Sequence, residues 1–292
     1  MIHELLNKHC YNFEYIKYSN GIFDSFVDVT YIITINDIEN VINKLKTFNP
    51  TSNIIIVKNK TYKECNKLLY EQDRHHDLTD ANINIIYHSI KNNYNNIMVL
   101  EDDFHFDLNK INSDNHINNI HTFFEKKKDE SFIYNIGSLP ILFHPFLIDK
   151  YHYKAIKLFS THSLIYNRKI QNKIFDFLLK RSFQYKQSKY YDIFITTLYT
   201  NYFYYTPLCY QTNENINDNN ISKYYTVHFY TKILDLNKIT NNRYELWFKF
   251  FIIINYIIYI LLVFIILFIL IRICNIILNI NMNSKNIKNK KS

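Results

Sequence analysis

The sequence contains very little glycine or proline: its 292 residues include two glycines, Gly21 and Gly137, and four prolines. This scarcity excludes a collagen-like repeat, a Gly/Ser linker and the glycine-rich phosphate loops of dinucleotide-binding and P-loop proteins. Cysteine is also sparse. None of the four cysteines belongs to a C-x-x-C pair, so neither a zinc ribbon nor a disulfide scaffold is predicted, and a reducing compartment is favoured.

Acidic residues are outnumbered, and the formal net charge is +8. Residues 272–292 contain no acid and contribute five of these positive charges, so the rest of the chain carries only +3. A basic face that binds nucleic acid is therefore not indicated, because the excess charge is concentrated in the tail. No nucleic-acid partner is expected.

One long segment lacks charge altogether. Phe250–Ile271 is 22 residues long, and Asn255 is its one strongly polar side chain. A helix of that length spans roughly 33 Å, compared with about 30 Å for the hydrocarbon core of a bilayer. Trp247 and Arg272 flank it in the manner of interfacial anchors. The alternative, a buried core helix, is disfavoured because such helices are rarely apolar on every side. We therefore predict a transmembrane helix over 249–271.

The N-terminal residues bear on the compartment in which the large domain lies. Residues 1–20 contain charged side chains and no apolar stretch, so no signal peptide is predicted. The pattern resembles a single-pass, tail-anchored protein whose large domain lies in the cytosol. Basic residues flank the apolar segment on both sides, so charge does not decide the orientation.

Strand and helix patterns alternate in the first hundred residues, which predicts β-α-β units, a parallel sheet and an α/β fold. The second predicted helix begins with Asp77 or Thr79 as its N-cap. The predicted elements are a strand at 26–35, a helix at 38–45, a strand at 53–57, a helix ending near 94 and a buried strand at 97–100.

The acidic triplet Glu101-Asp102-Asp103 follows the last of these strands directly. Ligands of open α/β sheets bind at the carboxyl ends of strands, and three carboxylates there repel one another unless a positive charge is bound. Two carboxylates with open water positions suit Mg²⁺ or Mn²⁺. An acidic turn that caps the next segment is the alternative interpretation.

These residues resemble the metal-binding motif of glycosyltransferase family 25, the lipopolysaccharide and collagen-galactosyltransferase group, which has the GT-A fold. The resemblance covers roughly residues 27–215. It implies a GT-A-like three-layer α/β/α fold with a mostly parallel central sheet. Besides the strand that ends in L-E-D-D-F, the similar segments are 132–137, the T-H-S and R-K residues within 160–169, Tyr191-Asp192 and 207–211.

The resemblance also implies an activity: transfer of a sugar from a UDP-sugar to a glycan, protein or lipid acceptor by a metal-dependent, inverting hexosyltransferase. Mn²⁺ or Mg²⁺ would be the cofactor. The implied roles are metal binding by Asp103, Glu101 and a late histidine, His228; donor binding by Thr34, Asn36, Glu101 and Asp102; and proton abstraction from the acceptor by the catalytic base Asp192. Packing is the alternative role of His228, and helix capping is that of Asp192.

The chain also departs from the family pattern at two places. No arginine lies between residues 38 and 46, where Lys44 or Lys46 would have to replace it, and Asp77–Asn82 replaces a G-C-x-x-S-H signature. An inactive, membrane-tethered binding or scaffold protein is therefore one alternative. A nucleotidyltransferase is another, because carboxylates at a strand end also fit metal-dependent nucleotidyl transfer. The expected parts are an N-terminal segment (1–26), a catalytic domain (27–235), a juxtamembrane stem (236–248), a transmembrane helix (249–271) and a basic tail (272–292).

Overall fold

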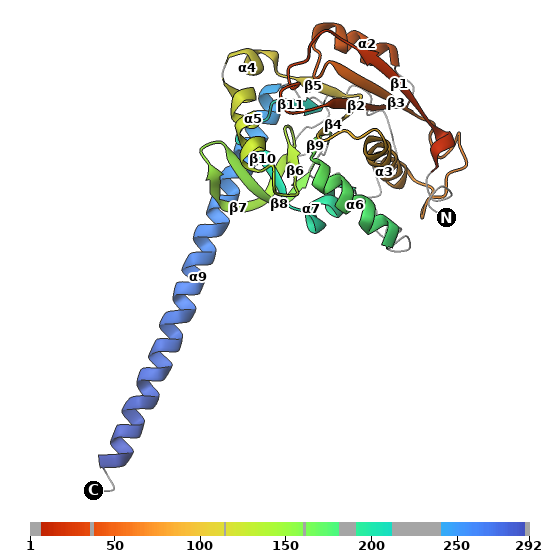
Figure 1. Ribbon diagram of the computed structural model, residues 1–292. Helices are drawn as coiled ribbons and strands as arrows, with labels where there is room; N and C mark the ends of the chain where they lie inside the picture. The colour runs from red at the N-terminus through yellow and green to blue at the C-terminus, as the bar shows by residue number, and fades with distance from the viewer. Residues whose placement is uncertain are drawn as a thin grey trace.

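The computed structural model describes residues 7–35, 38–113, 115–159, 162–180, 191–211 and 241–289. They form one globular α/β part from which a long C-terminal helix projects (Figure 1). The α/β class and the C-terminal apolar helix are as predicted.

The described residues build one large sheet and a two-stranded ribbon, in which β5 (Phe104–Phe106) pairs with β11 (Cys209–Gln211). The large sheet has nine strands. Their order across the sheet is β1 (Tyr11–Lys17), β3 (Asn53–Asn59), β2 (Val29–Thr34), β4 (Ile97–Glu101), β9 (Ser163–Tyr166), β6 (Ile133–Asn135), β10 (Asn201–Tyr204), β8 (His152–Phe159) and β7 (Leu139–Asp149).

The predicted β-α-β units form the parallel part of this sheet. Strand β2 pairs in parallel with β3 and with β4, so that Ile32 lies between Ile56 and Leu100. Strands β6 and β10 are also parallel, whereas the other five pairings are antiparallel. The sheet is therefore mixed, because β9 and the β7–β8 hairpin follow without the helical crossovers that parallel strands need.

Alternate residues of the central strands face opposite sides of the sheet and join separate hydrophobic clusters. On β4, for example, Leu100 belongs to one cluster and Val99 to the other. The first cluster includes residues of α2 (Ile38–Thr47) and α5 (His116–Lys126), and a short helix, α4 (Leu108–Ser113), precedes α5. The second includes residues of α3 (Arg74–Lys91), α6 (Arg168–Lys180) and α7 (Tyr191–Leu198).

The start of α3 differs from the prediction. Its N-cap is Asp73, whose carboxylate accepts hydrogen bonds from the backbone N–H groups of His75 and His76, at 3.0 and 2.9 Å. Asp77 and Thr79 therefore lie inside the helix and do not cap it. The difference arises because Asp73, like Asp77, is an acid near a helix start, and propensity does not separate two such residues.

The N-terminal segment is part of the domain. After a short 3₁₀ turn, η1 (Lys8–Cys10), strand β1 pairs along its full length with β3. Cys10 forms a disulfide with Cys65, with 5.8 Å between their Cα atoms. The prediction that the cysteines do not form a structural disulfide is therefore wrong. C-x-x-C spacing detects local pairs, whereas this bridge joins residues 55 positions apart.

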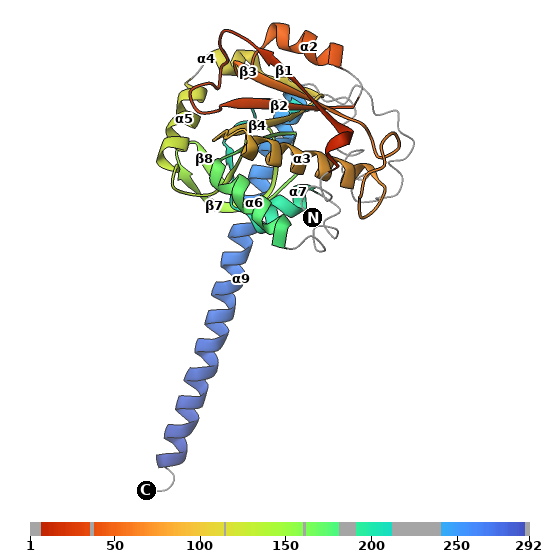
Figure 2. The ribbon, with the colours of Figure 1, turned by 45° about the vertical axis from the view of Figure 1, so that its right-hand side comes forward.

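Helix α9 (Asn241–Asn289) is one element that contains the described residues of the predicted stem, the transmembrane segment and the described residues of the tail (Figure 2). Among the described residues it is the one helix long and apolar enough to cross a membrane, with Glu245–Ile277 as the candidate span. Its first turns pack against the globular part. Phe248 is buried in a third cluster with Phe143 and Phe203, so the helix does not begin as a free stem.

Candidate active site

The acidic triplet lies at the carboxyl ends of two neighbouring parallel strands. Glu101 is the last residue of β4, and Asp102 and Asp103 form the turn into β5. Thr34 ends β2, and its hydroxyl donates a hydrogen bond of 2.7 Å to Asp102 Oδ2. Thr34 is buried, whereas the three acidic residues are partly exposed. This edge of the sheet therefore offers carboxylate oxygens to a ligand.

A lysine lies beside these acids. Lys44 of α2 donates a hydrogen bond of 2.7 Å to the carbonyl oxygen of Asp102, and its Nζ is 5.4 Å from the centre of the Phe104 ring. Lys46, the other candidate for the missing arginine, donates instead to Asn43 Oδ1 at 2.9 Å. Of the two lysines, Lys44 is thus the one whose charge lies at the strand end.

Two later segments of the chain border the same end of β4. The backbone N–H of Glu101 donates to the carbonyl of His162 at 3.2 Å, and His162 Nε2 lies 3.4 Å from the carbonyl oxygen of Cys209. Because a carbonyl only accepts, Nε2 carries the proton in this contact. A Cβ atom at Gly137 would overlap the Cys209 carbonyl oxygen and lie 2.7 Å from His162 Nε2. This close approach requires glycine.

Cys209 itself is a packing residue. It is fully buried, and this burial, with a smaller contribution from Asp103, raises the pKa of its thiol to about 12. The thiol is therefore neutral near pH 7 and is not a nucleophile.

The donor set at the triplet is compatible with a hard divalent cation. Mg²⁺ is usually held by one or two carboxylates, while waters and substrate phosphate oxygens fill its other positions. Glu101 and Asp103 are partly exposed residues, although Asp103 Oδ1 is buried, and Asp102 already accepts the Thr34 hydroxyl. Glu101 and Asp103 would therefore hold the ion, with Asp102 oriented beside it.

Among the described residues, three or more potential ligand atoms lie within 4.8 Å of one another at two places, and the acidic triplet is not one of them. Neither is an open metal site. In the first, His9, Cys10 and Cys65, both sulfur atoms belong to the disulfide. In the second, Glu71, Asp73 and His76, the Asp73 carboxylate is the N-cap of α3.

Three of the predicted site residues cannot be placed fully. Asn36 and His228 lie outside the described residues, and for Asp192 the structure describes the backbone, in the first turn of α7, but not the side chain. The neighbouring Tyr191 hydroxyl contacts that of Tyr166 at 2.8 Å. Because β9 is antiparallel to β4, Tyr166 pairs with Ile97, at the end of β4 opposite Glu101.

His162 and Arg168 lie just outside opposite ends of β9, so the T-H-S and R-K residues are also apart from each other. His162 lies beside Glu101, whereas Arg168 follows the other end of β9 and donates to the carbonyls of Tyr94 and Ile90 at 3.1 and 3.2 Å. Arg168 therefore links the start of α6 to the C-terminal end of α3. It also borders a cleft of about 430 Å³, which lies at this end of the strands and is remote from the acidic triplet.

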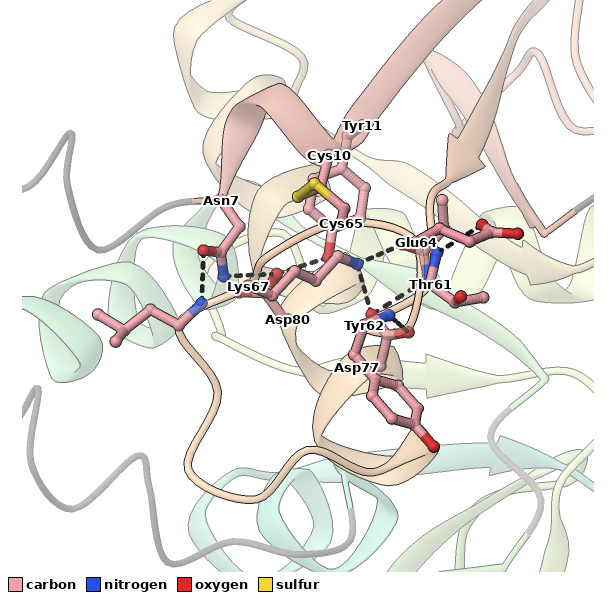
Figure 3. Close-up of a disulfide and its surroundings, with 12 residues drawn as sticks. Asn7, Cys10, Tyr11, Thr61, Tyr62, Glu64, Cys65, Lys67, Asp77 and Asp80 are labelled. Atoms are coloured by element: carbon pink, nitrogen blue, oxygen red, sulfur yellow. Dashed lines mark hydrogen bonds and ion pairs between the residues drawn. A yellow bond between two sulfur atoms is a disulfide. The ribbon is translucent and has the colours of Figure 1, made fainter.

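Sequence reasoning missed a buried polar cluster beside the disulfide (Figure 3). Lys67 has no exposed side-chain surface and pairs with Asp77 Oδ1; its Nζ also donates to Asn59 Oδ1 at 2.5 Å and to Tyr11 Oη at 2.8 Å. Tyr11 in turn donates to Asp80 Oδ2 at 2.5 Å. No spacing rule predicts such a cluster, because its members come from β1, β3, α3 and the loop that carries Lys67.

Burial dominates the electrostatics of this cluster. It lowers the pKa of Lys67, although the Asp77 carboxylate opposes the shift, and it raises the pKa of Asp80. Asp77 and Asp80 occupy the stretch that replaces the G-C-x-x-S-H signature. That stretch thus has a structural use here, as half of a buried ion-pair network.

Comparison with known proteins adds no assignment: no protein-family model matches the chain, and no curated protein matches it. A functional hypothesis therefore depends on the motifs and on their positions in the fold. The observation most relevant to function is the arrangement at the end of β4, where the acidic triplet, Gly137, His162 and Cys209 lie together.

Proposed function

We propose that the chain is a membrane-anchored, metal-dependent glycosyltransferase that moves a sugar from a UDP-sugar to an acceptor hydroxyl with inversion. The main support is the convergence of Gly137, His162 and Cys209 on the acidic triplet at one edge of the sheet. These residues belong to segments that resemble glycosyltransferase family 25. The finer fold assignment, a GT-A-like three-layer α/β/α domain, is part of this proposal.

The donor would bind at the carboxyl ends of β2 and β4. Glu101 and Asp103 would hold Mn²⁺ or Mg²⁺, with His228 as a further ligand; the bound ion would neutralise charge on the departing diphosphate. Thr34 keeps the Asp102 carboxylate oriented through its 2.7 Å hydrogen bond. Asn36 would complete the nucleotide site beside Thr34.

Charge and proton transfer would come from the chain's own side chains. The Lys44 ammonium lies at the strand end and would favour the negative diphosphate, although a lysine binds phosphate less specifically than an arginine fork does. Asp192 stays the base of this proposal, which requires the Asp192 carboxylate to reach the acceptor although Tyr191, beside it, contacts Tyr166 at the end of β4 opposite Glu101. The acceptor would be a glycan, a protein or a lipid near the membrane.

The direct test is hydrolysis of nucleotide sugars by the full chain in detergent micelles, with and without Mn²⁺. The full chain is needed because α9 buries Phe248 in the domain. Asp103→Asn should abolish Mn²⁺-dependent UDP release. Asp129→Asn is the matched control, because the Asp129 side chain is 89% exposed and pairs only at the surface, with Lys169. Absence of UDP release from every donor by a folded chain would reject the proposal.

A second candidate function is a membrane-tethered binding protein without enzymatic activity. It is favoured by the buried ion pair between Lys67 and Asp77, which occupies the place of a family signature. A folded chain that binds UDP-sugars but releases no UDP would support this candidate. Release of pyrophosphate from nucleoside triphosphates would instead indicate a nucleotidyltransferase.

The disulfide also bears on the compartment. Bridges of this kind persist in oxidising compartments and are rare in the cytosol, so we propose that the domain lies on the oxidising side of its membrane and not in the cytosol. The sequon at Asn220 offers a test through glycosylation in a eukaryotic host. The sequon at Asn59 should stay unmodified, because Asn59 is 3% exposed and accepts a hydrogen bond from Lys67. Full protease sensitivity of the domain from the cytosolic side would contradict this placement.

A further inference from the structure

Strand β7 is the last strand of the large sheet, and α9 covers its outer edge. The side-chain amide of Asn255 donates to the carbonyl of Ile141 at 2.8 Å and accepts from the N–H of Phe143 at 3.3 Å. The hydroxyl of Tyr259 donates to the Phe143 carbonyl. Edge strands need such partners for their free backbone groups. Asn255, the one strongly polar residue of the apolar run, is fully buried in this contact with β7.

Because α9 contacts β7 as far as Tyr259, only the residues after Tyr259 can be surrounded by lipid on all sides. The helix belongs to the domain as far as Tyr259, and the candidate span ends at Ile277. The intervening 18 residues or so extend about 27 Å, slightly less than the hydrocarbon core of about 30 Å, and they include Arg272. The bilayer surface must therefore lie close to the level of Tyr259, beside strand β7.

The β7–β8 hairpin is apolar and exposed at this level. Leu139 shares a cluster with Phe248, and Phe143 contacts Tyr259 further along both elements. Strand β7 and α9 therefore run in the same direction, and both figures show β7 and β8 at the end of the domain where α9 leaves it (Figures 1 and 2). The exposed apolar side chains of the hairpin are Phe146 (80% exposed), Leu147 (43%) and Ile148 (41%) beyond Phe143 and, on β8 at the level of Phe143, Ile156 (39%); His144, Lys150 and Lys157 are exposed among them.

We propose that Phe146, Leu147, Ile148 and Ile156 insert into the interfacial layer of the bilayer that α9 crosses. Burial of such side chains is favourable by about 25 cal/mol per Å² of apolar surface. Lys150, in the turn of the hairpin, is placed to meet lipid phosphates. The insertion stops at the interface, because a sheet edge cannot satisfy its backbone groups in hydrocarbon.

The proposal rests on the membrane anchoring by α9 and adds a second contact to it. Because α9 is docked on the domain through Phe248, Asn255 and Tyr259, the hairpin adds a second membrane contact at a fixed distance from the helix, and the two contacts together hold the domain in one orientation. The edge of the sheet with the acidic triplet would then keep a fixed height above the membrane. This would restrict the enzyme to acceptors within that distance of the lipid.

The test is fluorescence quenching of the full chain in phospholipid vesicles that contain a lipid with a shallow nitroxide quencher. An environment-sensitive label is attached to a single introduced cysteine in a Cys274→Ser background; Cys209 is buried and does not label. The positions are Phe146→Cys, Ile266→Cys within the span, and Tyr15→Cys, a control that is 62% exposed on β1 at the opposite edge of the sheet.

The expected result is loss of fluorescence at positions 146 and 266 and no loss at 15. Loss at 266 with 146 matching 15 would overturn the hairpin contact and leave the anchor in place. No loss at either 146 or 266 would overturn both. A blue-shifted label at 146 that the lipid quencher does not reach would mean that another protein copy covers the hairpin, which also overturns the proposal.

Discussion

Replacement of Cys10 and Cys65 by serine should lower the free energy of unfolding by about 4 kcal/mol. The bridge joins residues 55 positions apart, and the loop-closure relation for a loop of that length gives a loss of denatured-state entropy equal to about 4 kcal/mol at 25 °C. For a domain of this size that change corresponds to a fall in Tm of roughly 8–16 °C. The large value follows from the length of the loop.

The position of the bridge adds a second expectation. Cys10 directly precedes β1, and Cys65 lies two residues before the buried Lys67. Without the bridge, the hydrogen bonds from Lys67 to Tyr11 and from the Leu68 N–H to Asn7 Oδ1 still link the start of β1 to the segment that carries Lys67, and β1 keeps its pairing with β3. Amide hydrogen exchange should therefore accelerate more in β1 than in β4, which lies between two other strands.

The assay is chemical unfolding of the full chain in detergent micelles, with and without a reducing agent. Reduction of the wild-type chain and the double serine substitution should give the same lower midpoint, while reduction should not affect the double variant further. Cys274→Ser is the matched control, because Cys274 is an exposed free thiol on α9. The reasoning is refuted if the unreduced, denatured chain shows four reactive thiols, or if reduction leaves the midpoint unchanged.

Three further predictions concern single residues. Lys67→Met should lower the unfolding free energy by about 3–5 kcal/mol in urea titrations, because it leaves the buried Asp77 without its counter-charge. Burial lowers the pKa of His88 from 6.5 to about 4, so unfolding takes up a proton between these values and stability should fall as the pH drops through this window; His88→Gln should flatten that dependence. Asn255→Leu should cost about 1–3 kcal/mol and accelerate amide exchange at Phe143, whose N–H it leaves unpaired.

Each of these predictions has a control in the chain. Lys60→Met removes an exposed lysine, and equal losses for positions 60 and 67 would contradict the role of the buried pair. The control for the pH series is Asn118→Gln, which changes an exposed side chain without a titratable group and should leave the slope intact. Asn275→Leu makes the same change on the exposed part of α9, and amide exchange at Phe143 that responds to it as to Asn255→Leu would exclude the edge contact.

Local pattern was sufficient for the central parallel strands and for α2. The apolar runs of β2 and β4 and the amphipathic stripe of α2 lie where periodicity predicted them, because a buried strand and a one-sided helix each need a characteristic order of side chains. The acidic triplet could likewise be assigned to a strand end. The beginning of α3 could not be predicted, because Asp73 and Asp77 have similar capping propensity and tertiary contacts engage the second with Lys67.

The remaining features depend on contacts between distant parts of the chain. Nothing in the composition pairs Cys10 with Cys65, places Lys67 against Asp77, or turns Asn255 toward the free edge of β7. These partners meet only after the sheet has assembled, since their positions depend on strand order and on register. Composition and periodicity thus specified an α/β domain with acids at a strand end and an apolar helix. Tertiary packing alone decided that this helix begins as part of the domain, because the backbone groups of an edge strand require partners that only a neighbouring element can supply.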